Sequence, residues 1–363
     1  MDFTFSAEQD DFRQAVRTTL AAEAPSSYVR AMIDDPVGVT DELWWKMAEL
    51  GWLGVLVPES HGGLGLGLLD VVVLQEELGK LPFPGPFLSS AVAATLAAHR
   101  LGADELLTEL AAGARRGTVA IEETGVGDPL AGVRSRAKPD GDGYVLSGTK
   151  PVVLDGGSAD WALVVAEDDD GLGTFLLDAP AGALVPGLDV TRKLARLELD
   201  GRRARRIGPA GDQRELWRRV LDDVDVALCA ELVGTAERAL ELAVEYAKVR
   251  VQFDRPIATF QAIKHKAADM LHHLELARVG THYAAWASDT DSGERERAAA
   301  MAKGYAGEAA IDVTAECIQI HGGVGFTWDV DAHLLYRRAK QDDLLFGSQG
   351  YQRRRLAGLL LDG

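Results

Sequence analysis

The sequence predicts a mainly α-helical protein with a β domain in its middle. Two observations support this class: helical periodicity over about the first 115 residues and again from 212 onward, and short β-rich runs between them. The expected domains are residues 1–117, 118–209 and 210–363. A chain of 363 residues, of which 47% are hydrophobic, is long enough to build two or three packed domains.

The first region shows recognisable helix starts and breaks. Ser6 and Thr40 each precede acidic residues and an apolar periodic run, which is typical of N-caps. The glycine-rich stretch PESHGGLGLG at 58–67 and the proline-rich stretch LPFPGPF at 81–87 interrupt the pattern. We therefore expect helices that are separated at these two places.

The middle region has strand signals, and helical signals return after it. GYVLSG, WALVVAE and GTFLLDA are β-rich runs separated by DGDG and DDDGLG turns. Four long helices are then expected, over about 212–250, 259–289, 294–320 and 331–361. No sustained heptad seam is present, so a helical bundle is favoured over a coiled coil.

Composition excludes several classes of function. A formal charge of −18 argues against general nucleic-acid binding. Cys229 and Cys317 have no metal-ligand or disulfide spacing, and His272 and His273 point to different helix faces, so no metal site is expected. The N-terminus has no signal-peptide pattern and no window is apolar enough to span a bilayer, which favours a cytoplasmic protein.

A break in the helical pattern carries the first candidate site. In YAKVRVQFDRP, Pro256 disfavours helix at Arg255, so we expect the long helix to end near Phe253. Arg250, Gln252 and Phe253 are then presented at a helix end. A guanidinium binds phosphate, an amide bonds a ribose or base edge, and a phenyl ring stacks, so together they suit a dinucleotide. On local grounds alone, a solvated charge at Arg250 and a ring packed in the turn at Phe253 are the favoured explanation of the same residues.

The second candidate stretch is QIHGGVGFTWD at 319–329. Gly322 and Gly323 allow backbone N–H groups to approach a phosphate closely, and Gln319 adds an amide. Ordinary capping of a helix C-terminus is the alternative explanation for such glycines.

Together these stretches resemble the acyl-CoA dehydrogenase family, whose motifs are close to YAxxRxQFGxPIxxFQAIKH and QxxGGxGF. The resemblance implies an N-terminal helical domain, a β-barrel-like domain and a C-terminal four-helix bundle at the core of an oligomer. It also implies a flavoprotein with FAD between subunits. The cofactor-binding candidates, at the adenosine and pyrophosphate of the neighbouring subunit's FAD, are Arg250, Gln252, Phe253, Gln319, Gly322 and Gly323. Asp254 stands where the family usually has Gly, and we expect its side chain to point away from the pyrophosphate.

The family's catalytic base is missing from its usual place. Common members carry a Glu in a YEGT-like segment, and LLFGSQG puts Phe346 at that position. Some relatives carry the base 26 residues before the motif Arg, which is Val224 here. Asp223 and Asp225 flank it and are weak candidates, since adjacent helical residues are rotated by about 100°.

Family positions that touch the flavin ring are also altered. The TEPxxGSD-like stretch reads AIEETGVGDP and the KxWxT-like stretch reads TKPVVL. Glu122 replaces a Thr, Val152 replaces the Trp, and Leu154 replaces the second Thr. Residues that serve a partner's FAD are thus retained, while those that serve this chain's own ring and base are lost.

This contrast predicts a complementing subunit of an FAD-dependent acyl-CoA dehydrogenase, paired in a heterotetramer with a base-bearing paralogous subunit. The resemblance implies an acyl-CoA substrate from fatty acid or steroid side-chain degradation and electron-transfer flavoprotein as acceptor. Three alternatives stay open. They are a homomeric dehydrogenase with Asp225 or Asp223 as base, a flavin oxidase or monooxygenase of the same fold, and a cofactor-free interaction subunit.

Overall fold

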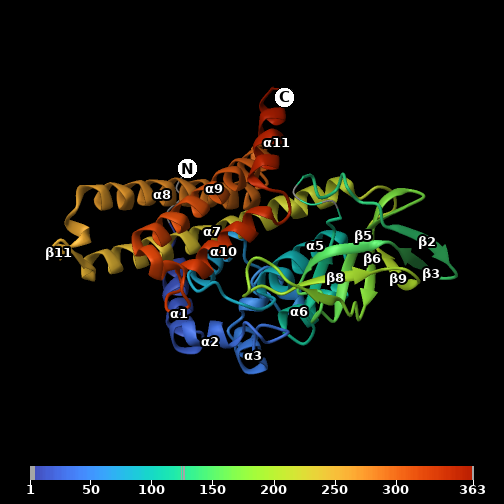
Figure 1. Cartoon of the computed structure of the whole chain (residues 1–363). Coiled ribbons are helices and arrows are strands. Elements are labelled where there is room, and N and C mark those ends of the chain that lie inside the picture. The colour runs from blue at the N-terminus through green and yellow to red at the C-terminus, as the bar shows by residue number, and fades with distance from the viewer. Residues whose placement is uncertain (1–4, 124, 126, 362–363) are drawn as a thin grey trace. The chain divides into compact units, whose positions relative to one another are not determined.

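The computed structural model describes residues 5–123, 125 and 127–361. Helices are followed by strands and then by helices again, which confirms the predicted fold class (Figure 1). The α-helices are α1 (Ala7–Glu23), α2 (Ser26–Ala31), α3 (Asp41–Glu49), α4 (Leu68–Gly79), α5 (Thr95–Leu101), α6 (Leu107–Ala111), α7 (Arg214–Val249), α8 (Gln261–Asp289), α9 (Arg295–His321), α10 (Ala332–Leu344) and α11 (Gln349–Leu361).

The expected helix caps are present. The Ser6 hydroxyl accepts a hydrogen bond from Gln9 N at 3.3 Å, and the Gln9 side chain accepts one from Ser6 N at 3.1 Å, which completes a capping box. Thr40 likewise accepts from Leu43 N at 3.3 Å. Both expected breaks also occur. The first contains only the single turn η2 (Glu59–His61), and the second ends where the π-helix η3 (Phe87–Ala94) begins.

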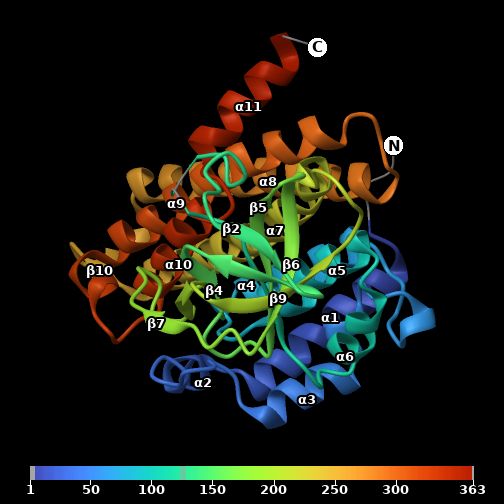
Figure 2. The same ribbon diagram turned by 90° about the vertical axis from the view of Figure 1, so that its right-hand side faces the viewer.

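The middle of the chain forms two sheets. One has six strands in the order β1-β5-β2-β3-β9-β6, and β6 also pairs with β5, so five of the strands close into a ring (Figure 2). The other sheet has the order β4-β8-β7. The strands are β1 (Gly117–Ala120), β2 (Arg136–Asp140), β3 (Gly143–Ser147), β4 (Thr149–Leu154), β5 (Trp161–Asp168), β6 (Gly171–Asp178), β7 (Ala183–Val185), β8 (Leu194–Glu198) and β9 (Arg202–Ile207).

Inward-facing side chains fill the space between these strands. Phe175 of β6 and Leu146 of β3 are fully buried, and Tyr144 packs against Phe175 with ring centroids 5.0 Å apart. The three β-rich runs singled out in the sequence correspond to β3, β5 and β6. Short β-rich runs bounded by turn residues were therefore a sufficient signal for this part of the chain.

The chain divides into two compact units. One consists of Met1–Arg30, Val72–Phe83 and Val226–Gly363, and the other of Ala31–Val71 and Pro84–Asp225. The first unit holds most of the helical bundle, and the second holds both sheets. The three domain ranges expected from the sequence stay a prediction, because this grouping follows packing and not changes of secondary structure.

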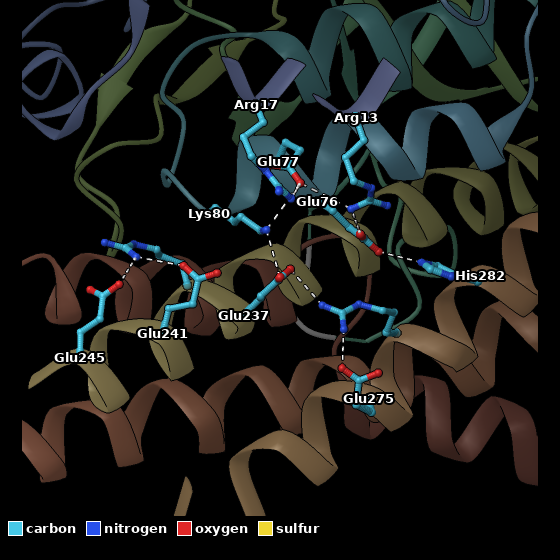
Figure 3. A network of polar contacts seen from close by, with 12 residues as sticks. Arg13, Arg17, Glu76, Glu77, Lys80, Glu237, Glu241, Glu245, Glu275 and His282 are labelled. Carbon is cyan, nitrogen blue, oxygen red and sulfur yellow. Dashed lines mark hydrogen bonds and ion pairs between the residues drawn. The ribbon is translucent and has the colours of Figure 1, made fainter. Parts of the chain in front are cut away.

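A buried carboxylate joins three helices of the first unit. Glu76 of α4 is 1% exposed on its side chain and accepts hydrogen bonds from Arg13 of α1 at 2.6 Å and His282 of α8 at 2.8 Å (Figure 3). A Cβ on Gly234 of α7 would lie 1.9 Å from Glu76 O, so only glycine allows this close approach of α7 to α4. Figure 3 shows the network continuing through Glu77, Lys80 and Glu237.

The expected helix over 331–361 is wrong in one respect, because the chain breaks between α10 and α11. Phe346 has φ 57° and Gly347 has φ 107°, and such left-handed backbone cannot continue an α-helix. Lys303 of α9, which is fully buried, donates to Asp342 O at 2.7 Å and Leu345 O at 3.1 Å. Its ammonium therefore caps the negative end of α10.

Candidate functional site

The first candidate stretch forms a two-stranded hairpin after α7. The helix ends at Val249, four residues before the predicted end near Phe253. Strand β10 (Val251–Gln252) pairs with β11 (Arg255–Pro256), and the two-residue turn between them has φ 52° at Phe253 and φ 61° at Asp254. Two successive positive φ angles define a type I′ turn, in which glycine is favoured at the second position. Asp is one of the few other residues that tolerate this backbone.

The hairpin holds the predicted binding residues in solvent. Phe253 is 86% exposed, which excludes the expected alternative of a ring packed inside the turn. It meets the edge of Phe260 with centroids 6.0 Å apart, and the Arg255 guanidinium lies 4.3 Å from the Phe260 ring centroid. Among the described residues, none forms an ion pair with the exposed Arg250. Figure 1 shows this hairpin at the end of the unit where the chain passes from α7 to α8.

The second candidate stretch forms an open turn at the end of α9. Gly322 has φ 64° and ψ −142°, which an L side chain rarely adopts. A Cβ on Gly322 or Gly323 would meet nothing within 4 Å, so the backbone of both is open. Gly325 differs, since a Cβ there would lie 2.9 Å from Ile318 O. The turn η6 (Gly322–Phe326) thus folds back on α9 at Gly325 and leaves Gly322 and Gly323 free.

Two aromatic residues bring these stretches together. Tyr246 of α7 and His321 of α9 stack with centroids 4.4 Å apart and an interplanar angle of 21°. Tyr246 lies one helical turn before Arg250, and His321 directly precedes Gly322. Sequence reasoning missed both rings, although a His immediately before two glycines at a helix end was an available signal.

All six predicted cofactor-binding residues are exposed, and the structure gathers them around the ends of α7 and α9. They are Arg250, Gln252, Phe253, Gln319, Gly322 and Gly323. The donor set suits an anionic dinucleotide, since it offers a free guanidinium, open glycine backbone and an exposed phenyl ring. The side-chain amide of Gln252 donates to the carbonyl of the neighbouring Val251 at 2.8 Å, so one of its donors is already paired.

The family's base position carries a buried apolar residue. Phe346 is 6% exposed and sits in the left-handed segment after α10. Gln349 N donates to Asp343 Oδ1 at 3.1 Å, and a Cβ on Gly307 of α9 would lie 2.3 Å from the same oxygen. The chain on both sides of Phe346 therefore packs closely against α9.

Of the two flanking acids on α7, Asp223 is held in an ion pair. Asp223 is 1% exposed, and its carboxylate accepts a 2.5 Å hydrogen bond from the Arg100 guanidinium. An acid held in such an ion pair has the geometry of a structural carboxylate. Val224 and Asp225 are buried as well.

The altered positions near the family's flavin ring lie in the second unit. Val152 is 36% exposed and Leu154 is 5% exposed. Thr124 and Val126, within the AIEETGVGDP stretch, lie outside the described residues. The same stretch is anchored by Lys150, which is fully buried and donates to Ile121 O at 2.9 Å and to Glu123 Oε1 at 2.5 Å.

Burial and pairing shape the titration of this Lys150–Glu123 pair. Burial lowers the pKa of Lys150 to about 8, although the charge of Glu123 opposes the shift. Burial acts to raise the pKa of Glu123, but the ammonium of Lys150 and hydrogen bonds from Ser135 and Arg134 outweigh it, so that pKa is lowered. The pair therefore holds the start of the stretch in place electrostatically.

Comparison with known proteins decides the family. The model of the acyl-CoA dehydrogenase N-terminal domain matches residues 6–117, and that of the C-terminal domain matches residues 218–361. The chain belongs to the acyl-CoA dehydrogenase family. Acyl-CoA dehydrogenase IpdE2 of Mycolicibacterium smegmatis is 33% identical over 352 residues, which cover 97% of this chain and 98% of the relative.

Solved acyl-CoA dehydrogenases have the same architecture. A variant of the Tcur3481-Tcur3483 steroid ACAD matches with a TM-score of 0.89 and 35% identity over 98% of both chains. A chain of the ChsE4-ChsE5 complex from Mycobacterium tuberculosis matches with a TM-score of 0.89 and 32% identity over the full length of both. These matches confirm the resemblance and the fold expected from the motifs.

Membership has direct consequences for chemistry. Proteins of the acyl-CoA dehydrogenase family are flavoproteins, and the curated relatives are oxidoreductases. Within the part of the chain that the structure describes, no group of His, Cys, Asp and Glu side chains is arranged to hold a metal ion. In the same residues, no helix has the length and apolar character needed to cross a bilayer.

Proposed function

We propose that this chain is a complementing subunit of an FAD-dependent acyl-CoA dehydrogenase. It would bind the adenosine and pyrophosphate of an FAD whose flavin ring lies in a partner subunit. One contrast carries the proposal. Arg250, Phe253, Gly322 and Gly323 are open to solvent at the ends of α7 and α9, whereas Phe346 fills the position of the base.

Each retained residue has a defined task in this proposal. FAD, when bound, accepts a hydride from the β-carbon of the acyl thioester. The Arg250 guanidinium binds the pyrophosphate, and the backbone N–H groups at Gly322 and Gly323 approach it without hindrance from a Cβ. Phe253 offers its exposed face to the adenine, and Gln319 offers an amide to the ribose or base.

The partner subunit would supply what this chain lacks. Removal of the substrate's α-proton needs a carboxylate, and Phe346 cannot act as a proton acceptor. The similar ChsE4-ChsE5 complex is named for two different chains, which supports a heteromeric assembly. We propose a heterotetramer with a base-bearing paralogue, with a homo-oligomer as the alternative assembly. An acyl-CoA of fatty acid or steroid side-chain degradation would be the substrate and electron-transfer flavoprotein the acceptor, in the cytoplasm.

Two other functions give different results in solution. A homomeric dehydrogenase that uses Asp223 or Asp225 would let acyl-CoA reduce flavin in the chain alone. The ion pair between Asp223 and Arg100 disfavours Asp223 as the base. A flavin oxidase or monooxygenase of the same fold would need no α-proton acceptor. In such a chain the reduced flavin would react with oxygen, and the substrate would be of a different class from an acyl-CoA that is dehydrogenated.

Co-expression tests the proposal. The chain is purified alone, and also together with a paralogous acyl-CoA dehydrogenase of the same genome that carries Glu at the position of Phe346. We expect the two chains to co-purify, and the mixed assembly to hold flavin that acyl-CoA reduces. Failure of every such paralogue to co-purify, together with full flavin content in the chain alone, would refute the complementing role.

A further inference from the structure

The contact between α7 and α9 near their C-terminal ends pairs Tyr246, which belongs to the first family motif, with His321, at a position that the second motif leaves unspecified. Tyr246 and His321 stack at 4.4 Å, directly beneath the exposed ends that carry Arg250 and Gly322. His321 is only 6% exposed, although the residues that follow it in the chain are open to solvent. A buried, stacked imidazole therefore lies under the predicted binding residues.

Contacts with Cys317, one turn earlier in α9, fix the orientation of the His321 imidazole. His321 Nδ1 lies 2.8 Å from Cys317 O, and since a carbonyl oxygen only accepts, Nδ1 carries the hydrogen. The Cys317 Sγ lies 3.7 Å from the same nitrogen. Burial raises the pKa of the Cys317 thiol to about 12, so a neutral thiol and not a thiolate adjoins the ring. The tautomer and the plane of the ring are thus set by α9 itself.

The stack adjoins both stretches of the candidate site. On one side, Arg250 N donates to Tyr246 O at 2.9 Å, so Arg250 begins one turn above the phenol ring. On the other side, a Cβ on Gly325 would lie 3.0 Å from His321 Cβ, so the turn after α9 folds back against the first side-chain carbon of His321. The stacked rings therefore join the residue one turn before Arg250 to the residue directly before Gly322.

We propose that Tyr246 and His321 are positioning residues, which hold Arg250 at the spacing from Gly322 and Gly323 that a diphosphate requires. This inference rests on the proposed function, because it assumes that these groups bind the pyrophosphate of FAD. Neither ring needs to touch the ligand. A binding site that is loosened by a fraction of an ångström loses most of its advantage, since its donors must then be ordered on binding.

The test separates local order from binding. The variants are Tyr246→Ala and His321→Ala, with Tyr246→Phe as the conservative variant that keeps the stack. The control is Tyr305→Ala on α9, whose ring meets His273 with centroids 6.4 Å apart. Hydrogen exchange of the amides from 322 to 328 is followed in the full chain, and FAD binding is titrated in the flavin-stripped mixed assembly.

We expect both Ala variants to exchange these amides faster and to bind FAD about tenfold more weakly, while Tyr246→Phe and Tyr305→Ala match the wild type. Equal exchange in Tyr246→Ala and Tyr305→Ala would overturn the positioning role. So would faster exchange without weaker binding, and both results would leave the proposed function intact. A wild-type assembly that binds no FAD would overturn the proposed function itself, and this inference with it.

Discussion

Replacing Arg250 by Ala removes the single side chain on which the proposed pyrophosphate site depends most. The backbone should be unaffected, because Arg250 N donates to Tyr246 O and its carbonyl accepts from Ile257 N at 2.8 Å, and alanine retains both groups. Arg250 is exposed, and no described residue forms an ion pair with its guanidinium. The free energy of unfolding should therefore change by only about 0.5 kcal/mol or less.

The effect on binding should be far larger. A hydrogen bond to a charged group contributes about 1.5–3 kcal/mol. Since about 1.4 kcal/mol corresponds to a factor of ten, the dissociation constant of FAD should rise roughly ten- to a hundredfold. Arg250→Lys should recover only part of this, because an ammonium keeps the charge but loses the forked geometry of the guanidinium.

The assay measures the flavin occupancy and the thermal stability of each variant in the mixed assembly. Each variant is incubated with limiting FAD and freed of unbound flavin, and its visible absorbance is divided by its protein content. Arg202→Ala is the control, because its guanidinium donates to Ala179 O at 2.7 Å and Pro180 O at 3.1 Å, within the second unit. Equal occupancy in Arg250→Ala and Arg202→Ala would refute the assignment of Arg250 to the pyrophosphate.

Further predictions concern the base position, assembly and the buried network. Phe346→Glu in the chain without a partner should not confer acyl-CoA-dependent flavin reduction, because Val152, Leu154 and Glu122 do not supply the usual contacts to the flavin ring. Flavin absorbance is followed anaerobically with a panel of acyl-CoAs. Rapid bleaching would favour a recently inactivated homomeric enzyme. The chain should be at least a dimer by light scattering at micromolar concentration, and a monomer would contradict a shared flavin site. Glu76→Gln should cost about 1.5–3 kcal/mol at pH 7 in urea unfolding, because it removes the buried charge and replaces one of the two oxygens that accept from Arg13 and His282 by a donor. Burial acts to raise the pKa of Glu76, but His282 and Arg13 outweigh it and lower that pKa below its usual 4.5, so its contribution is present above that pH and is lost as pH falls. The wild type should thus lose more stability between pH 5 and pH 3 than the variant, and parallel curves would contradict the role of this carboxylate.

Local signals were enough to predict most of the fold. Ser6 and Thr40 cap their helices as their side chains suggested, and the β-rich runs became β3, β5 and β6. Pro256 correctly marked a break, but it did not reveal that Phe253 and Asp254 would both adopt positive φ in a tight hairpin. Asp254, at the position where the family has Gly, was the sequence signal for that turn, but it was interpreted only as a negative charge.

The structural features that the sequence did not predict depend on contacts between residues far apart in the chain. The break at Phe346 has no proline, and it is held by Lys303, whose ammonium caps α10 from a different helix. The buried position of His321 depends on Tyr246, which lies 75 residues earlier in the sequence. Helical periodicity carries no information about such partners, so the candidate residues were found but the rings that hold them were not.

Anaerobic mixing of acyl-CoA with flavin-loaded protein tests the central claim most directly. The measurement follows flavin absorbance for the chain alone and for its assembly with a base-bearing paralogue, both loaded with FAD and both treated with the same acyl-CoA panel. The account predicts no bleaching in the chain alone, because Phe346 removes no proton, and rapid bleaching in the mixed assembly. Rapid bleaching in the chain alone would contradict it, because this chain would then carry a complete active site of its own.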